Sequence, residues 1–322
     1  MFNQECYCAQ YKGPELIDST SGGVFFAFAK YFIEHNGCVY GAAFSDFPHL
    51  KHVCVENIQD LKKIQGSKYL ESDFSFVLPE IKNRVENGQL VLFSGTPCQI
   101  AAVRSFLKKD YPNAFFIDIL CHGTPSKKVF LEYIKWREKK WNVRLLNFEF
   151  RNKRISAWGS EQKALATTSG GEKIIPAACD PYFSAFQKGL IAQKRCYVCK
   201  YASPNRVGDI TAADFWGIRI LRPNFPYSNG ASCLLVNTSK GKEFFEYLKK
   251  DFLLEKMSFE DARKYNPHFN RPLKFNPIQN EIYSILEDNK GFSNVLSKIP
   301  YQTFGFYLIK KYLRHIRNFI RF

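Results

Sequence analysis

Four cysteines lie in short sequence contexts that suit metal or redox chemistry. Cys98 and Cys121 each follow a short apolar run, and Cys196 and Cys199 form a Cys-x-x-Cys pair. Four thiolates can hold either a zinc ion or an iron–sulfur cluster. The spacing of the Cys-x-x-Cys pair alone favours zinc, and a redox pair without metal is a further alternative. These residues predict a metal or redox site if the fold brings all four together.

The apolar runs before Cys98 and Cys121 have the pattern of buried strands. Residues 90–93 and 115–117 are short and apolar, and Gly and Pro follow soon after each run, which is typical of a parallel sheet. Open α/β sheets bind their ligands at the carboxyl ends of the strands. We therefore expect Cys98 and Cys121 at that edge, with the Cys-x-x-Cys pair reaching it from elsewhere in the chain.

Helical and strand patterns alternate through the first half of the chain, as they do in βαβ units. The predicted fold class is α/β, with a mostly parallel or mixed central sheet flanked by helices and a helical C-terminal region. Expected helices cover residues 24–33, with Ser21 as the N-cap, and residues 58–64, 76–85 and 181–191. Further strands are expected at 38–44, 52–55, 145–150, 163–167, 173–175, 209–217 and 232–236, and the last third is mostly helical.

Length and composition describe a globular chain. It has 322 residues, of which 45% are hydrophobic, enough for a sizeable core. No apolar run approaches the roughly 20 residues of a membrane span, and the N-terminus lacks the features of a signal peptide, which predicts a cytoplasmic protein. Because cytosolic thiols stay reduced, the ten cysteines favour metal or redox roles over disulfides.

Part of the net charge of +16 lies at the C-terminus, where residues 310–322 carry five Lys or Arg and no acid. Apolar residues recur there at helical spacing, which predicts a basic amphipathic helix. Such a helix suits a peripheral contact with the inner membrane face or docking on an acidic partner, and packing on its own domain is the alternative. Nucleic-acid binding ranks last because no recognisable binding motif is present.

Seven short segments together resemble, in order, the beta subunit family of the coenzyme F-420 (deazaflavin)-dependent hydrogenases and dehydrogenases. Each alone is weak, but together they are specific and span about two thirds of the chain. The segments are Ser19-Thr20-Ser21-Gly22-Gly23, Gly66-Ser67-Lys68-Tyr69, Phe93-Ser94-Gly95-Thr96-Pro97-Cys98-Gln99, Cys121-His122-Gly123-Thr124-Pro125-Ser126, Phe150-Arg151-Asn152-Lys153, Cys196-x-x-Cys199, and Gly208-Asp209-Ile210 through Asp214-Phe215-Trp216-Gly217.

The resemblance implies a flavin and iron–sulfur oxidoreductase that passes electrons between a donor protein and a small organic acceptor. The implied cofactors are FAD and one [4Fe-4S] cluster, and the implied cluster ligands are the four cysteines Cys98, Cys121, Cys196 and Cys199. The implied flavin contacts are Ser21, Gly22, Gly23, Gly66, Ser67, Lys68, Tyr69, Gly95, Thr96, Pro97, Arg151 and Lys153.

The residue types of the flavin contacts fit an anionic cofactor. Gly22 and Gly23 precede a helix, where backbone N–H groups and the helix dipole favour a pyrophosphate. Lys68 can add a point charge, and Arg151 and Lys153 can bind an anionic group. The alternatives are an ordinary tight helix entry for the two glycines and a solvated basic loop around residue 151.

His122 follows a predicted cluster ligand and is the predicted catalytic residue. It could donate a proton near the flavin, because histidine titrates close to neutral pH. A hydrogen bond that only orients the loop is the alternative role. By order along the chain, we expect a flavin-binding α/β portion at 1–88, a cysteine-bearing α/β core at 89–240, and a helical region at 241–322.

The chain differs from many family members at its N-terminus. Only Cys6 and Cys8 precede the first matched segment, and two cysteines cannot ligate the clusters of the ferredoxin module that these members carry. A separate ferredoxin-like donor is therefore the predicted partner, docking near Lys194, Arg195 and Lys200. The motifs leave the small acceptor unidentified, deazaflavin included. The alternative function is a zinc-stabilised or redox-inactive binding protein of the same fold.

Overall fold

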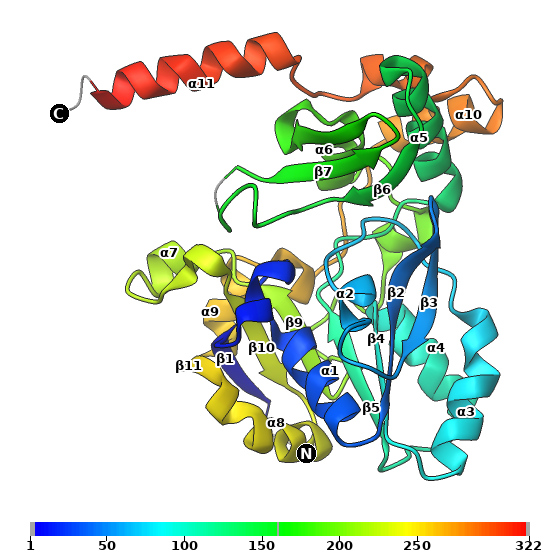
Figure 1. The fold of residues 1–322 in the computed structure, drawn as a ribbon, viewed down its shortest axis with the longest axis vertical. Coiled ribbons are helices and arrows are strands. Elements are labelled where there is room, and N and C mark those ends of the chain that lie inside the picture. Colours follow the sequence, from blue (N-terminus) through cyan, green and yellow to red (C-terminus); the bar gives the residue numbers. More distant parts are fainter. Residues whose placement is uncertain (1–3, 160, 320–322) are drawn as a thin grey trace.

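The computed structural model describes residues 4–159 and 161–319, with side chains described up to residue 313. The chain builds an eight-stranded sheet in its lower half and a three-stranded sheet above it (Figure 1). The larger sheet has the strand order β11-β1-β10-β9-β5-β4-β2-β3. Its strands are β1 Glu5–Tyr11, β2 Cys38–Asp46, β3 His49–Val55, β4 Val91–Gly95, β5 Ala114–Ile119, β9 Ile210–Asp214, β10 Ser232–Val236 and β11 Phe252–Met257.

The centre of the larger sheet is parallel and its two sides are antiparallel. Strand β4 pairs in parallel with β2 and β5, and β5 pairs in parallel with β9. Strands β3, β10, β1 and β11 are added antiparallel. The predicted α/β class with a mixed central sheet is confirmed. The sheet takes strands from all three expected portions of the chain, whose boundaries stay a prediction.

Helices cover both faces of this sheet because the central strands are apolar on both sides. Along β4, Leu92 packs on one face under α1 (Val24–Glu34) and α8 (Ser239–Leu248). Val91 and Phe93 pack on the other face under α3 (Leu78–Glu86) and α4 (Pro97–Leu107). Because successive side chains of a strand point to opposite faces of the sheet, β4 packs against a layer of helices on each side.

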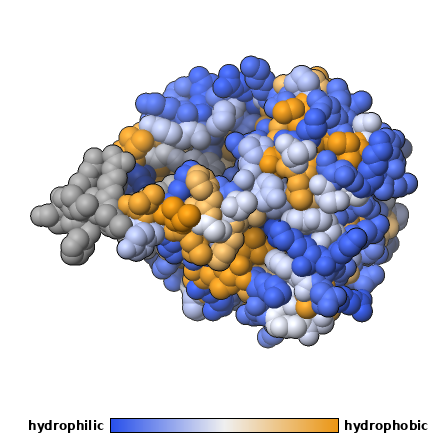
Figure 2. Space-filling view, turned by 90° about the horizontal axis from the view of Figure 1, so that it is seen from above, coloured by the Kyte–Doolittle hydropathy of each residue, from blue (hydrophilic) through white to orange (hydrophobic). Residues whose placement is uncertain are grey.

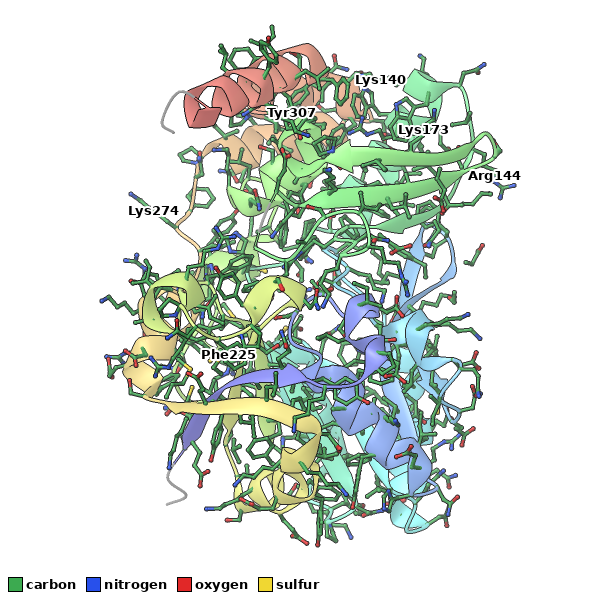
Figure 3. The ribbon with its side chains drawn as sticks, turned by 60° about the vertical axis from the view of Figure 1, so that its left-hand side comes forward. Lys140, Arg144, Lys173, Phe225, Lys274 and Tyr307 are labelled. Atoms are coloured by element: carbon green, nitrogen blue, oxygen red, sulfur yellow. The ribbon has the colours of Figure 1, made fainter. Side chains whose placement is uncertain are left out.

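The smaller sheet is an antiparallel meander with an aromatic core. It contains β6 (Leu145–Glu149), β7 (Lys163–Thr168) and β8 (Gly171–Pro176), and a tight turn joins β7 to β8. Phe130, Tyr133, Phe148, Phe150 and Tyr182 are buried beneath it. Lys140, Arg144 and Lys173 project outward from this layer (Figure 3). The helices that pack with this sheet are α5 Lys127–Trp141, α6 Pro181–Gln187 and α10 Ile278–Glu287.

Two strands of the larger sheet, β1 and β11, are not predicted by the sequence patterns. Strand β1 lies between β10 and β11, and six of its seven residues are buried, yet it contains no Val, Ile, Leu or Phe. Strand β11 lies in the last third, which the sequence predicts as mostly helical. The expected helix 181–191 ends earlier, at Gln187. The remaining helices are α2 Leu61–Ile64, α7 Ile218–Leu221, α9 Phe259–Lys264 and α11 Phe304–Phe319.

Helix α11 extends away from the body of the molecule at its upper end (Figure 1). The described part of this helix is buried against the body at Tyr307, whereas Leu308, Ile309, Tyr312 and Leu313 beyond it are exposed, so packing on its own domain is seen at the start of the helix. Among the described residues, no helix is both long enough and apolar enough to cross a bilayer.

Candidate functional site

A cavity of about 650 Å³ lies at the carboxyl edge of the parallel strands. Its wall includes Gly95 and Thr96 after β4, Cys121 after β5, and Trp216 after β9. These residues meet because parallel strands direct their carboxyl ends to the same edge. The loop before α1, the segment after α2 and α6 of the upper layer complete the wall.

Eleven residues that the sequence predicts for the site line this one cavity. They are Ser21, Gly23, Gly66, Ser67, Lys68, Tyr69, Gly95, Thr96, Cys121, His122 and Arg151. Six other predicted residues are outside the lining set, namely Gly22, Pro97, Cys98, Lys153, Cys196 and Cys199. The structure therefore gathers segments that lie far apart in the sequence, and their roles as cofactor contacts stay predictions.

The entry to helix α1 differs from the expected one. Ser21 is not the N-cap, because Gly23 precedes the first helical residue and adopts φ +79°. Such a left-handed conformation is accessible to glycine at little cost. The Ser21 hydroxyl instead donates to the carbonyl of Ala231 at 2.8 Å. Gly23 therefore turns the chain into α1 at the cavity wall.

Gly22 serves packing rather than a ligand. Its N–H donates to the hydroxyl of Ser232 at 2.9 Å, and its carbonyl accepts from the N–H of Tyr11 at 2.8 Å. A Cβ atom at this position would lie 2.2 Å from the carbonyl oxygen of Ala9. The amide of Gly22 is thus already engaged, which corrects the expectation that it donates to a phosphate.

The two predicted lysines are held by backbone carbonyls. Lys68 Nζ donates to the carbonyls of Gln65 at 2.6 Å and Gly66 at 3.2 Å, and burial lowers its pKa to about 7. Lys153 Nζ donates to the carbonyls of Ser21 at 2.9 Å and Asn229 at 2.6 Å, and burial likewise lowers its pKa to about 7. Lys68 therefore belongs to the cavity, whereas Lys153 holds the loop that carries Ser21.

The guanidinium of Arg151 is paired with Asp214, a residue for which the sequence predicts no role in the site. This guanidinium donates to both carboxylate oxygens of Asp214, at 2.6 and 3.4 Å, and to the Tyr69 hydroxyl at 3.4 Å. The indole N–H of Trp158 also donates to Asp214, at 3.2 Å, and Trp158 stacks on Trp216 with centroids 5.8 Å apart. The charge of Arg151 is therefore paired, and its visible role is to order this wall.

The four cysteines lie near one another beside the cavity. Burial raises the pKa of Cys121 to about 12, and the charges of Cys196, Cys98 and Cys199 add to the shift. Thr124 N–H lies 3.5 Å from the sulfur of Cys196. The fold therefore brings Cys196 of the Cys-x-x-Cys pair against the loop that follows β5. Within residues 4–159 and 161–319, no three His, Cys, Asp or Glu side chains are arranged to hold a single metal ion.

A buried carboxylate positions the chain that follows the Cys-x-x-Cys pair. Asp118, near the end of β5, accepts from Arg206 at 2.8 Å and from the backbone N–H groups of Val207 at 3.1 Å and Gly208 at 2.9 Å. Both Asp118 and Arg206 side chains are buried. This segment leads from the cysteine pair into β9, so Asp118 fixes where it crosses the sheet edge.

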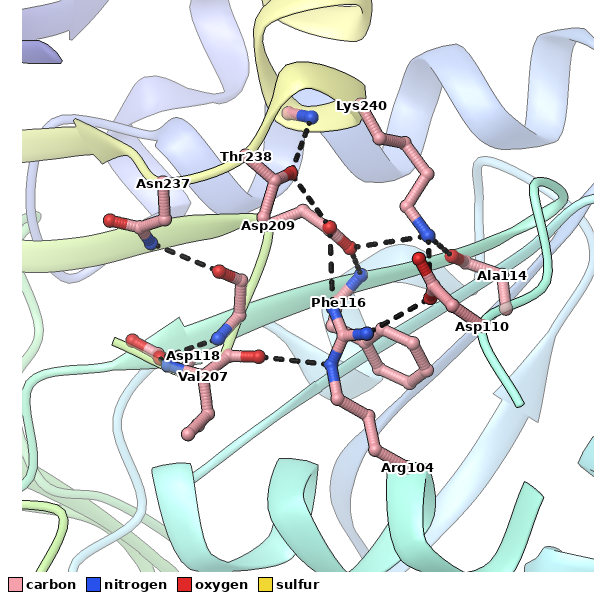
Figure 4. Close-up of polar contacts among 12 residues, drawn as sticks. Arg104, Asp110, Ala114, Phe116, Asp118, Val207, Asp209, Asn237, Thr238 and Lys240 are labelled. Carbon is pink, nitrogen blue, oxygen red and sulfur yellow. Dashed lines mark hydrogen bonds and ion pairs between the residues drawn. The ribbon is translucent and has the colours of Figure 1, made fainter. Parts of the chain in front are cut away.

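Asp209, the residue after Gly208, also holds this segment in place through hydrogen bonds (Figure 4). Its carboxylate accepts from Phe116 N–H at 2.9 Å, from Arg104 at 3.2 Å and from the Thr238 hydroxyl at 2.9 Å. Burial raises the pKa of Asp209, while Lys240 and Arg104 oppose the shift. The resemblance segment around residue 209 therefore has a structural explanation.

A hydrogen-bonded chain runs from a buried histidine to Cys98. The ring of His52 stacks on Phe93, its Nε2 donates to the Ser94 carbonyl at 3.0 Å, and its Nδ1 accepts from Ser72 at 3.1 Å. Gln99 Nε2 donates to Ser72 at 2.9 Å. Because a carbonyl only accepts, Nε2 carries a proton, and because burial lowers the pKa of His52 to about 4, Nδ1 is unprotonated at neutral pH.

The chain continues through the loop after β4. Gln99 Oε1 accepts from the N–H and hydroxyl of Thr96, at 3.0 and 3.1 Å, and the Thr96 hydroxyl lies 3.1 Å from the sulfur of Cys98. Cys98, the second residue of α4, is exposed. The sequence shows Gln99 in a family-like segment, but nothing local indicates that it joins Cys98 to a buried histidine.

His122 pairs with a histidine that sequence reasoning missed. Its Nε2 donates to the Gln187 carbonyl at 3.0 Å, so its Nδ1 accepts from Nε2 of His268 at 2.7 Å. Both histidines line the cavity, and burial lowers the pKa of each, that of His268 to about 4. Since 146 positions separate them, no local pattern could have indicated the pair.

The fold and site define an α/β protein with a cavity and a group of cysteines at the carboxyl edge of its parallel strands. The model of the family described as the C terminus of the coenzyme F420 hydrogenase/dehydrogenase beta subunit matches residues 88–262, more than half of the chain. The chain belongs to this family, whose members are oxidoreductase subunits.

A solved structure shares the fold over most of its length. It is a chain of the F420-reducing [NiFe] hydrogenase complex from Methanosarcina barkeri, studied by xenon derivatization. The TM-score is 0.55 with 18% identity, over 90% of this chain and 94% of that chain. At this identity the likeness concerns the fold alone. No curated protein sequence matches the chain.

Proposed function

We propose that this protein is an oxidoreductase subunit that uses FAD and one [4Fe-4S] cluster to transfer electrons between a ferredoxin-like protein and a small organic acceptor. One observation carries the proposal. Cys121 lines the large cavity, and Thr124 in the loop that follows it contacts the sulfur of Cys196 through its N–H at 3.5 Å and its hydroxyl at 3.9 Å. A cluster on these thiols would therefore adjoin a ligand in the cavity, as electron transfer requires.

The cavity residues fit a flavin nucleotide. Lys68 uses two carbonyls among the described residues, and an ammonium group has three donors, so one remains for a phosphate. Binding an anion would also restore the full charge of Lys68, whose pKa burial lowers to about 7. A volume of about 650 Å³ lies within the range of cofactor sites.

The cysteine group fits thiolate ligation by a cluster. Burial raises the pKa of Cys121, and neighbouring thiolates repel one another, so a bound cation would favour the charged forms. Flavin and cluster together would exchange hydride equivalents for single electrons. In this proposal, the chain itself holds His122 and His268 in a defined tautomer against the cavity and keeps a proton-carrying group there.

Cofactor analysis of purified variants tests the proposal. Anaerobically purified protein should contain iron, sulfide and flavin, with little zinc. Cys98→Ser should lose most of the iron, whereas Cys179→Ser, a half-buried cysteine outside the group, should keep it. Lys68→Ala should lower flavin occupancy with iron unchanged. Stoichiometric zinc without iron or flavin in the wild type would favour the binding-protein alternative and end this proposal.

The partner is proposed to dock beside the cysteine pair. Val198, between Cys196 and Cys199, is 81% exposed, and Lys194 and Lys200 are exposed beside it. Arg195 is already ion-paired with Glu71, so the two lysines are the better candidates for contact with an acidic donor. Complementary charge would speed encounter with such a protein.

Charge reversal measures this docking. Lys194→Glu with Lys200→Glu should slow flavin reduction by an added ferredoxin about tenfold at low salt, and less at high salt where charges are screened. The matched control is Lys249→Glu with Lys250→Glu, at the opposite end of the molecule. Equal rates in the two variants at every salt concentration would place the donor elsewhere.

A further inference from the structure

Helix α11 presents an apolar face that the described part of the chain leaves uncovered. Leu308, Ile309, Tyr312 and Leu313 are 47%, 59%, 68% and 56% exposed. These positions lie on one side of a helix of 3.6 residues per turn. Contiguous apolar surface of this kind usually marks an interaction site.

The root of the helix is fixed to the upper layer. The Gln302 N–H donates to the Ala178 carbonyl at 2.8 Å, and the Tyr307 hydroxyl donates to the carboxylate of Glu161. Tyr307 is buried at this root (Figure 3). Beyond it, the helix runs out from the body (Figure 1), and apolar side chains gather beside the grey terminus in Figure 2. A fixed root and a projecting stripe give the helix a defined direction.

Charge separates two kinds of partner for this face. Residues 289–322 contain no Asp or Glu, and their Lys and Arg residues number seven. By helical periodicity, Lys310 and Lys311 fall at the two borders of the apolar stripe. A helix that lies flat on a bilayer needs cations at both borders, where they reach lipid phosphates. A protein groove that covers the stripe would need acidic residues along both of its rims to pair with these cations.

We propose that α11 binds the surface of an anionic lipid bilayer, with its apolar stripe in the headgroup region and with Lys310 and Lys311 on lipid phosphates. The site is separate from the cavity and does not depend on the proposed redox function. Each cation near an anionic surface adds to binding, and salt weakens the interaction.

Sedimentation with vesicles tests the proposal on the full chain. The protein should sediment with vesicles of equal parts phosphatidylcholine and phosphatidylglycerol, much less with phosphatidylcholine alone, and less in high salt. Lys310→Glu with Lys311→Glu should weaken binding to the mixed vesicles at least about tenfold. Ile309→Ser with Leu313→Ser should weaken it by a similar factor, since the stripe is then polar.

The control is the pair Lys249→Glu and Lys250→Glu, which reverses two charges at the other end of the molecule and should bind like the wild type. Equal loss in this control would show that only net charge matters and would overturn the proposal. So would a concentration-dependent dimer that Ile309→Ser with Leu313→Ser abolishes, without vesicle binding by the wild type, because the stripe would then be an interface between proteins.

Discussion

The cysteine-bearing sheet edge and helix α11 differ in whether their side chains find partners within the protein. At the sheet edge, buried Asp118 and Asp209 accept hydrogen bonds from backbone N–H groups and arginines, so the loops are fixed from within. On α11, exposed Ile309 and Leu313 lie on a helix whose charges are all positive. Contacts that stabilise the fold therefore explain the geometry of the sheet edge. The contacts of the described residues do not explain why α11 is apolar on one side and basic elsewhere.

This contrast has a functional side. A redox site needs its cofactors at fixed positions, which buried ion pairs and hydrogen bonds can supply. A surface helix can bind a partner with little effect on the site, because the described side chains of α11 beyond Tyr307 are exposed. Substitutions at the edge should therefore change stability and cofactor content together, and substitutions on α11 should change neither.

The largest expected effect is that of Asp118→Asn. The substitution leaves the buried Arg206 without its carboxylate and places an amide donor near the N–H groups of Val207 and Gly208, so we expect a loss of about 3–5 kcal/mol in the free energy of unfolding. Urea unfolding monitored by circular dichroism measures it. The exposed Asp110, which also pairs with an arginine, provides the control, and Asp110→Asn should cost less than about 1 kcal/mol.

A smaller effect is expected from pH. Burial lowers the pKa of His52 to about 4, whereas an unfolded histidine titrates near 6.5. Between these values the unfolded chain binds the proton more tightly, so the free energy of unfolding should fall as pH decreases, by about 1–3 kcal/mol from this residue. Urea unfolding at pH 7 and pH 5 should show a flatter dependence in His52→Gln. The exposed His35 serves as a comparison, and an equal flattening in His35→Gln would contradict this assignment.

The smallest expected effect is on α11. Leu313→Ala removes an exposed side chain and should change the free energy of unfolding by less than about 0.5 kcal/mol. The same substitution at Leu92, buried in the central sheet, should cost about 2–5 kcal/mol. Thermal unfolding of both variants sharpens the comparison. A large loss in Leu313→Ala would mean that α11 packs on the body in solution.

Local sequence patterns predict most elements of the fold because each depends on short-range periodicity. The apolar runs before Cys98 and Cys121 become β4 and β5, and the expected helix at 24–33 is α1. Strand β1 was not predicted, because it is buried on both faces, which removes the alternation by which strands are recognised, and because it contains no Val, Ile, Leu or Phe. Its place between β10 and β11 depends on pairing across more than 200 positions.

The sequence by itself determined which residue types are present and placed most of the apolar runs in their strands and helices, though not β1 and β11. It placed Cys98 and Cys121 after buried strands and gave α11 its two faces. Only the tertiary structure decided that His268 meets His122, that Asp214 takes the charge of Arg151, and that Gly22 packs against β1 instead of offering its amide. The physical reason is that local periodicity reports burial, whereas partners far apart in sequence are chosen by the packing of the whole chain.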